Sequence, residues 1–287
     1  MPVQSNHLSL EILIATMNRT NLDFLQPMFQ FNPIEGFTVL VVNQTTPDKL
    51  LLEGKKNVRV INRFETGLCK SRNVALRESQ ADICLIADDD LIYEPDLKRK
   101  ILNAYARYPN ADFISFQAKN KNGDSYQNYP KRGMHNPKSL KKTNSIVMSF
   151  TRKKYIEKSL FFNTYFGLNG LFKGAEEYVF LRDALEKGFE MYHDNTFIVT
   201  HPDVSSGFLM GSDQSFVART ALARRYLKSV SYLWLVKYTL WMWKDGYITR
   251  GELSKKFRLG LWSIKQYHKL EKLGKINAIP TDRNSEN

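Results

Sequence analysis

The first half of the chain alternates short apolar runs with segments of helical periodicity. The apolar runs cover residues 10–16, 37–42, 58–62 and 83–87, and helical patterns cover residues 21–30, 71–79 and 95–108. Continuously apolar strands are typical of a sheet buried on both faces, and their alternation with helices indicates βαβ units. The pattern therefore predicts an α/β fold with a mostly parallel sheet flanked by helices.

The pattern changes after Asp112. Further strands are predicted over residues 113–116, 146–150 and 196–199, and a helix over 175–187 that ends at Gly188. A polar, Asn/Lys/Gly-rich segment over residues 119–142 separates two of these strands. Loops of this length in compact domains are usually functional or disordered.

The C-terminal region is aromatic and basic. Six apolar residues at steps of three and four predict one face of an amphipathic helix: Leu253, Phe257, Leu261, Ile264, Tyr267 and Leu270. Between Arg219 and Lys275 there are 14 Lys and Arg against three acidic residues, a surplus of 11 in a chain of net charge +13.

Three interpretations of this basic region stay open. It docks on an anionic membrane surface, with Lys and Arg at the headgroups and Trp and Tyr at the interface. It binds nucleic acid, with aromatic rings stacked on bases. Or its aromatic residues pack a pair of helices onto the rest of the chain and leave the lysines in solvent.

Length and composition set further limits. A chain of 287 residues, 43% of them hydrophobic, is long enough for one large domain or a domain with an appendage. Two cysteines, Cys69 and Cys84, provide no disulfide framework. The start of the chain lacks the pattern of a signal peptide, and no apolar segment reaches about 18 residues. We therefore expect a cytoplasmic protein without a spanning helix.

Three consecutive carboxylates, Asp88, Asp89 and Asp90, follow the apolar run at residues 83–87. Ligands of open α/β sheets bind at the carboxyl edge of the strands. Adjacent carboxylates repel one another unless cations or donors neutralise them, and Mg²⁺ or Mn²⁺ is commonly shared between carboxylates and substrate phosphates. The triplet predicts a metal–phosphate site, and the alternative is an acidic turn that ends a strand.

The segment Gly67–Leu76 places a glycine, Lys70 and Arg72 at the start of a predicted helix. Helix N-termini attract phosphate through unpaired N–H groups, and basic side chains add charge-assisted bonds. The alternative is a helix capped by Ser71 with a solvated basic face.

Together, four motifs resemble the family 2 glycosyltransferases. They are, in chain order, Ile14–Arg19, Val42–Gln44, Gly67–Leu76 and Asp88–Asp90. The resemblance covers about residues 9–207 and implies the GT-A fold, in which a mostly parallel nucleotide-binding sheet is flanked by helices. It implies a catalytic domain over residues 1–217, with a donor half at about 9–112 and an acceptor half at about 113–217. A helical extension over 218–276 and a disordered tail over 277–287 would follow.

The resemblance also implies roles for single residues. The set implied to bind the nucleotide sugar is Thr16, Asn18, Arg19, Asn43, Gln44, Gly67, Lys70, Arg72, Asn73, Asp88 and Asp89. The metal, Mn²⁺ or Mg²⁺, would be held by Asp90, Asp88 and His201. A histidine before proline is otherwise often a turn residue, so the role of His201 stays open. Residues 203–207 would form a mobile loop over the donor.

Family members carry an acidic pair at the start of a helix, and its second position is the catalytic base. Here the pair is Glu176 and Glu177, so a glutamate replaces the usual aspartate. Neighbouring helix residues point about 100° apart, so the two side chains cannot act in the same direction. We expect Glu177 to be the base and Glu176 to contact or orient the acceptor. The alternative is a pair that stabilises the helix dipole.

The implied activity is inverting, metal-dependent transfer from a nucleotide-diphosphate sugar, by default a UDP-sugar, to a hydroxyl group of a glycan or lipid-linked glycan. Such a protein would act in surface polysaccharide synthesis, in the cytoplasm or on the inner face of the cytoplasmic membrane. Two alternatives are a metal-dependent nucleotidyltransferase, which needs no acceptor base, and a nucleic-acid-binding protein. The latter has no need for Glu176, Glu177 and His201.

Overall fold

The computed structural model describes residues 8–52, 56–201 and 210–277. These residues form two compact units, one within residues 1–162 and 180–204 and the other within 163–179 and 205–287. Each unit is described by itself. The expected mobile loop at 203–207 and nearly all of the expected tail at 277–287 lie outside the described residues.

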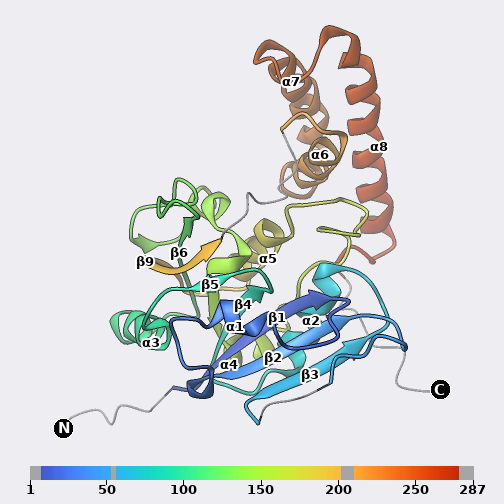
Figure 1. The fold of residues 1–287 in the computed structure, drawn as a ribbon. Helices are drawn as coiled ribbons and strands as arrows, with labels where there is room; N and C mark the ends of the chain where they lie inside the picture. The colour runs from blue at the N-terminus through green and yellow to red at the C-terminus, as the bar shows by residue number, and fades with distance from the viewer. Residues whose placement is uncertain (1–7, 53–55, 202–209, 278–287) are drawn as a thin grey trace. The chain divides into compact units, whose positions relative to one another are not determined.

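The first unit begins with a parallel sheet (Figure 1). Its strands are β1 (Leu10–Met17), β2 (Thr38–Gln44), β3 (Val58–Arg63) and β4 (Ile83–Asp88). β1 lies between β2 and β4, β3 is the outer neighbour of β2, and all three pairings are parallel. Most apolar residues of β1, β2 and β4 are buried, among them Ile12, Val39 and Leu85, whereas β3 is only partly buried. This half confirms the predicted parallel α/β sheet.

Beyond β4 the sheet becomes mixed. The remaining strands are β5 (Ile92–Tyr93), β6 (Phe113–Asn120), β7 (Gly133–Met134), β8 (Met148–Thr151) and β9 (Met191–His201). The order is β3-β2-β1-β4-β8-β6-β9-β5, with β7 paired to β9. β8 runs antiparallel to β4 and β6, whereas β6 and β9 are parallel.

Two strand predictions in this half need correction. The strand expected at 196–199 is the end of the 11-residue β9, which the polar residues at 192–196 conceal. The strand expected at 146–150 starts as a 3-10 turn, η3 (Ser145–Val147), before β8. The segment at 119–142 is anchored by the buried Leu140 and by Tyr129, whose hydroxyl accepts a hydrogen bond from the Ala118 N–H at 3.0 Å.

The helices of this unit are α1 (Leu25–Met28), α2 (Leu68–Glu78), α3 (Leu97–Arg107) and α4 (Arg152–Glu157), with α5 (Glu176–Glu186) shared between the units. Short 3-10 turns are η1 (Ile34–Gly36) and η2 (Ser139–Lys142). The helix expected at 21–30 is only the four residues of α1. Its predicted first turn is instead a local turn in which the Asn21 side chain accepts from the Asp23 N–H.

The predicted start of α2 was three residues late. Gly67 is the residue before the helix, with φ of 132°, a conformation that glycine adopts without strain. Ser71 is therefore inside the helix rather than its cap. Its buried hydroxyl lies 3.3 Å from the carbonyl of Val42 and ties α2 to β2.

Besides the start of α5, the described part of the second unit forms the helices α6 (Asp213–Leu227), α7 (Ser231–Lys244) and α8 (Leu253–Lys272), coloured orange to red in Figure 1. Short turns η4 (Lys228–Val230) and η5 (Arg250–Glu252) connect them. The six predicted apolar positions of α8 all pack in two apolar clusters with α6 and α7. The predicted amphipathic helix is therefore confirmed, and its apolar face is used inside the unit.

Glycine 260 sets the approach of α7 to α8. A Cβ atom there would lie 2.3 Å from Cδ1 of the buried Leu235. In the described part of the chain, no helix has the length and apolar character needed to cross a membrane. Cys69 and Cys84 are both buried free thiols, as expected from their number.

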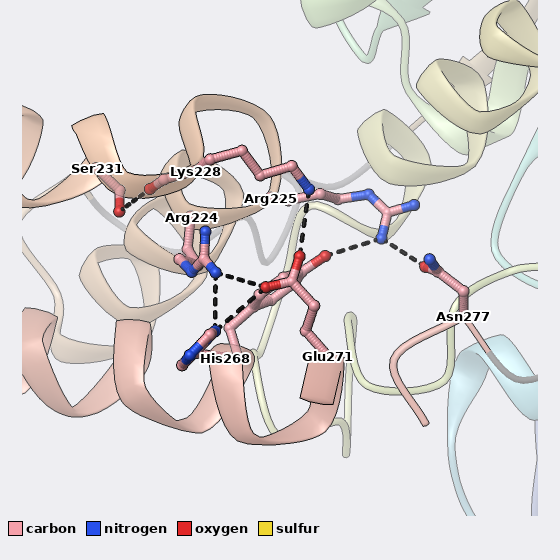
Figure 2. A network of polar contacts seen from close by, with 8 residues as sticks. Arg224, Arg225, Lys228, Ser231, His268, Glu271 and Asn277 are labelled. Atoms are coloured by element: carbon pink, nitrogen blue, oxygen red, sulfur yellow. Dashed lines mark hydrogen bonds and ion pairs between the residues drawn. The ribbon is translucent and has the colours of Figure 1, made fainter. Parts of the chain in front are cut away.

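One carboxylate joins α8 to α6 and to the turn between α6 and α7 (Figure 2). Glu271 of α8 accepts from Arg224 of α6 at 2.5 Å and from Lys228 of η4 at 3.2 Å. His268 lies between them, 2.8 Å from Arg224. Nearby, Arg225 donates to the Asn277 side chain at 2.8 Å and to the Tyr267 hydroxyl at 3.1 Å. Burial disfavours the charged carboxylate, but the hydrogen bonds and the positive charge of Arg224 outweigh it and lower the pKa of Glu271.

We predict that Glu271→Gln destabilises the second unit by about 1 kcal/mol at neutral pH, because Arg224 and Lys228 lose their anionic partner. A carboxylate whose pKa falls on folding stabilises the fold above its ordinary pKa, here 4.5. That contribution declines as the pH falls below 4.5 and is lost below the folded pKa. Urea unfolding followed by tryptophan fluorescence measures it, since all four tryptophans lie in α7 and α8.

The control is Glu157→Gln in the first unit, whose carboxylate is exposed and 3.9 Å from Lys153. It should leave the tryptophan transition unchanged. A stability difference for Glu271→Gln that persists unchanged at pH 3 would contradict the electrostatic explanation.

Candidate active site

The carboxyl ends of the four parallel strands bring the predicted residues to one edge of the sheet. Thr16 of β1 pairs with Asn43 of β2, and Asn43 with Asn62 of β3. On the other side of β1, Asp88 is the last residue of β4 and pairs with Ala15. Asp88 therefore belongs to the strand, whereas Asp89 and Asp90 lie in the turn that follows it.

Asn43 and Asn62 fix the turn after β1. The buried amide of Asn43 accepts from the Arg19 N–H at 3.1 Å and donates to the Arg19 carbonyl at 3.0 Å. It also donates to Asn62 at 3.0 Å. Asn18, just before, has a positive φ of 56° and donates its N–H to the Gln44 carbonyl at 2.8 Å. Asn43 therefore positions the backbone on which Arg19 is carried.

The Gln44 side chain fixes the backbone at Gly67, where α2 begins. The side chain accepts from the Gly67 N–H at 3.1 Å and donates to the Gly67 carbonyl at 3.0 Å. The Gly67 N–H, expected to face a phosphate, is thus bonded to Gln44 in this structure. Lys70 is 44% exposed and forms an ion pair with Glu65 at 3.0 Å. A diphosphate would have to compete for Lys70 with this partly exposed carboxylate.

Arg72 provides the charge that Asp88 requires. The guanidinium is 2% exposed, and its Nη2 donates to Asp88 and to the Ser145 hydroxyl, both at 2.9 Å. It also lies 5.5 Å from the centre of the Phe162 ring, within cation–π range. A buried cation held from three sides is a fixed feature of the fold, so Asp88 is neutralised before any ligand binds.

Asp89 is neutralised from the opposite side. One of its oxygens accepts from the Thr16 hydroxyl and from Nε of Arg19, the latter at 2.7 Å. The Arg19 side chain is 42% exposed and its guanidinium lies 5.2 Å from the centre of the Phe24 ring. Thr16, Arg19 and Asp89, all predicted donor contacts, therefore form one group at the edge.

Asp90 differs from its two neighbours. Among the described residues it has no lysine or arginine partner, and its carboxylate lies 3.7 Å from Nε2 of His201, at the end of β9. Burial, together with the charges of Asp88 and Asp89, raises the pKa of Asp90, and His201 opposes this shift. The His201 side chain is 10% exposed, and its ring lies 5.4 Å from that of Tyr126.

The donor set at Asp90 fits a hard divalent cation that is shared with a substrate. Within the described ranges no group of three or more His, Cys, Asp or Glu is arranged to hold a metal. Of the expected ligands, Asp88 is already bound to Arg72, whereas Asp90 and His201 face each other. Mg²⁺ usually takes one or two carboxylates and completes its shell with water and phosphate oxygens. Asp90 can provide one such carboxylate, with the His201 imidazole beside it.

Asn73 lies away from this group. Its fully buried side chain accepts from the Phe162 N–H at 2.7 Å and donates to the Phe162 carbonyl at 2.9 Å. The amide thus holds the chain that follows α4 against α2. Asn73 thereby positions Phe162, whose ring centre lies 5.5 Å from the Arg72 guanidinium.

The acidic pair belongs to the second unit. Glu176 and Glu177 form the first turn of α5, Glu176 being buried and Glu177 half-buried. The two preceding residues, Gly174 and Ala175, both have positive φ, 111° and 64°. Ala175 is strained in this conformation, and such strain tends to be concentrated at functional sites. The helix therefore starts abruptly at the acidic pair.

Sequence reasoning missed two residues of the site. Asn62 is the last residue but one of β3 and pairs with Asn43, so its place near a strand end was a usable signal. Ser145 bonds to Arg72 across 73 residues of chain, and no local pattern marks it.

Comparison with known proteins identifies the family of this chain. The model of glycosyl transferase family 2 matches residues 12–179, more than half of the chain. The chain therefore belongs to glycosyl transferase family 2. An uncharacterized glycosyltransferase of Haemophilus influenzae is 30% identical over 114 residues, which are 38% of this chain and 39% of that protein.

Solved structures support the GT-A fold. The crystal structure of S. aureus TarS matches with a TM-score of 0.58 at 14% identity, over 94% of this chain and 50% of that one. S. aureus TarS 1–349 in complex with UDP-GlcNAc matches with a TM-score of 0.54 at 14% identity, over 94% and 93%. At this identity the likeness concerns the fold, so the predicted fold class is confirmed.

We predict that Arg72→Met destabilises the first unit by about 2 kcal/mol, because Asp88 loses its buried cation. The loss is smaller than the 3–5 kcal/mol typical of fully buried pairs, since the Asp88 side chain is 31% exposed. Urea unfolding measures it. Adding Asp88→Asn to Arg72→Met should recover part of the loss.

The matched control is Arg99→Met, which removes an exposed arginine 2.5 Å from Asp96 and should cost less than about 0.5 kcal/mol. An equal loss for both arginines would mean that burial of Arg72 has no special role.

Proposed function

We propose that this chain transfers a sugar, with inversion, from a nucleotide-diphosphate sugar to a hydroxyl group of a glycan or lipid-linked glycan. The observation that carries the proposal is that the three carboxylates of this family 2 chain have different ion-pair partners. Asp88 and Asp89 are neutralised by arginines, while Asp90 faces His201. A UDP-sugar is the default donor, and the solved structure of TarS 1–349 with UDP-GlcNAc supports that choice.

The donor would bind at the strand edge. Thr16, Asn18, Asn43 and Arg72 are assigned to the environment of the base and ribose, and Asp88 or Asp89 to the ribose or the sugar. Because Asn43 and Arg72 are buried and bonded to residues of the strand edge, they would act by positioning Arg19 and Asp88. The exposed polar groups of Arg19 and Asp89 then make the direct contacts.

Asp90 and His201 would hold Mn²⁺ or Mg²⁺. When bound, the metal offsets the negative charge that develops on the departing diphosphate. The protein contributes a carboxylate that, among the described residues, has no lysine or arginine partner, and a histidine whose ring lies 5.4 Å from that of Tyr126.

Glu177 would remove the proton from the acceptor hydroxyl. The family pattern assigns the base to the second residue of the acidic pair, and Glu177 is more exposed than Glu176. The buried Glu176 is assigned to orienting the acceptor or its neighbour. A lipid-linked acceptor in surface polysaccharide synthesis would bring the enzyme to the inner face of the cytoplasmic membrane.

A nucleotidyltransferase would share the metal–phosphate group but need no base at Glu177. The following variant separates the two functions. Glu177→Gln should reduce transfer by about 10²–10⁴-fold, the usual contribution of a general base, and leave donor binding unchanged. Nucleotide release from a panel of donors and acceptors measures transfer, and thermal stabilisation by UDP with Mn²⁺ measures donor binding.

The control variant is Glu186→Gln at the other end of α5, an exposed carboxylate 3.4 Å from Arg182, which should keep full activity. Unchanged turnover in Glu177→Gln would exclude it as the base, and the same measurements on Glu176→Gln would then decide between the two.

Asp90→Asn should abolish the part of the UDP-dependent thermal stabilisation that requires Mn²⁺, because the carboxylate without a cation partner is lost. Stabilisation by UDP alone should persist. Asp96→Asn, an exposed carboxylate at the start of α3, is the control and should retain both effects. Metal-dependent stabilisation that survives Asp90→Asn would refute the assignment of the metal.

A further inference from the structure

Helix α7 differs in composition from the other helices of its unit. Among its 14 residues, Ser231–Lys244, only Lys237 and Lys244 are charged, and none is acidic. Apolar and aromatic side chains occur all around the helix. A helix of this kind is normally buried on every side or lies against a membrane.

Only one face of α7 is covered by the described residues. The inner face packs in an apolar cluster with Phe216 of α6 and Ile264 of α8, through Leu235, Tyr238 and Met242. The outer face is apolar as well, and its exposed residues are Val230 just before the helix, Tyr232, Leu233, Val236, Leu240, Trp241 and Trp243. Leu233 is 74% exposed and Leu240 45%.

The two lysines lie on the same outer face. Leu233, Lys237, Leu240 and Lys244 follow one another at steps of four, three and four, which places them in one row along the helix. The exposed surface of α7 is therefore a row of leucines and lysines flanked by aromatic rings. Lysine stems reach along apolar surface while their ammonium groups stay in water.

The length of α7 excludes one explanation of this surface. Fourteen residues of helix are about 21 Å long, and the hydrocarbon core of a bilayer is about 30 Å thick. The helix therefore cannot cross a membrane, but it can lie in the interface with its apolar face in the acyl boundary.

The positive charge of this region favours an anionic partner for the outer face of α7. The region from Arg219 to Lys275 has a surplus of 11 positive charges, and α7 has no carboxylate to repel an anionic surface. Two copies of this region would repel each other across a self-contact. Anionic phospholipid headgroups attract basic residues near the surface, and Trp and Tyr favour the interface between headgroups and acyl chains.

We propose that the outer face of α7 docks the protein on an anionic phospholipid surface. Leu233 and Leu240 enter the acyl boundary, Lys237 and Lys244 contact the headgroups, and Trp243 lies at the interface. The sequence alone left the whole region 218–276 as a candidate. The structure favours α7 as the lipid-facing surface, because six of its large apolar residues are exposed, whereas the predicted apolar face of α8 packs inside the unit and Trp262 alone is exposed there among the described residues. This docking does not depend on the proposed sugar transfer.

The wild-type chain provides the first test. All four tryptophans lie in α7 and α8, so tryptophan fluorescence reports on this unit without a label. Vesicles containing phosphatidylglycerol should shift the emission to shorter wavelength and carry the protein upward in a flotation gradient. Vesicles of phosphatidylcholine alone should do neither at the same protein concentration, and raised salt should weaken the binding. No flotation with anionic vesicles would overturn the proposal.

Variants then locate the surface. Leu233→Ser with Leu240→Ser should weaken vesicle binding at least about tenfold, since two exposed apolar side chains are removed. Lys237→Gln with Lys244→Gln should weaken it about fivefold for each lysine at low salt. The matched control is Leu50→Ser with Leu52→Ser in the first unit, where the leucines are 41% and 74% exposed, and binding should be unchanged.

Three results would overturn the assignment. One is full binding by the Leu233→Ser, Leu240→Ser variant. The second is equal affinity for neutral and anionic vesicles. The third is a dimer of the wild-type chain in solution that this double variant dissociates, because α7 would then be a contact between copies. The double variant keeps the buried inner face, and an unchanged thermal transition verifies that it is folded. UDP-dependent stabilisation, measured in parallel, reports on the donor site separately.

Discussion

The first unit depends on the neutralisation of carboxylates at the end of β4. Three adjacent aspartates at one sheet edge would repel one another and destabilise the turn, and the cost is greatest where burial removes solvent. The fold solves this with Arg72, brought from α2 into the interior beside Asp88, and with Arg19, brought by the turn after β1 beside Asp89. Much of the remaining architecture of the edge serves to hold these two arginines.

That dependence explains why so many polar side chains at the edge are buried. Gln44 forms two hydrogen bonds with the backbone of Gly67, where α2 begins, and so fixes the helix that carries Arg72. Asn43 forms two hydrogen bonds with the backbone of Arg19. A buried amide is tolerated only where its hydrogen bonds are satisfied, and both amides meet that condition through the main chain. Asp90 differs from the other two aspartates because it faces a histidine, whereas Asp88 and Asp89 each pair with an arginine.

The parallel half of the fold was predictable because its strands are short, apolar and local in pattern. The strand ends also marked Thr16, Asn43 and the aspartates as neighbours. What the sequence did not reveal was how each side chain is used. The roles of Asn43, Gln44 and Asn73 as supports for backbone depend on contacts between distant segments, such as Asn73 with Phe162, 89 residues apart. The extent of β9 was hidden because polar residues interrupt its apolar pattern, and register with β6 decides its length.

The second unit shows the same limit in a different form. The spacing of apolar residues in α8 correctly predicted a buried face, since period 3.6 is a local property. Helix α7 has no such contrast around its axis, so its sequence could not say which side faces inward. The structure decides this through Gly260, which lets Leu235 approach α8 closely, and through the packing of Met242. The opposite side, with Leu233 and Leu240, is therefore exposed because α7 packs through its other face, although its side chains are apolar. An apolar surface that persists on a basic helix requires a partner that offers both hydrocarbon and negative charge, and an anionic lipid interface provides both.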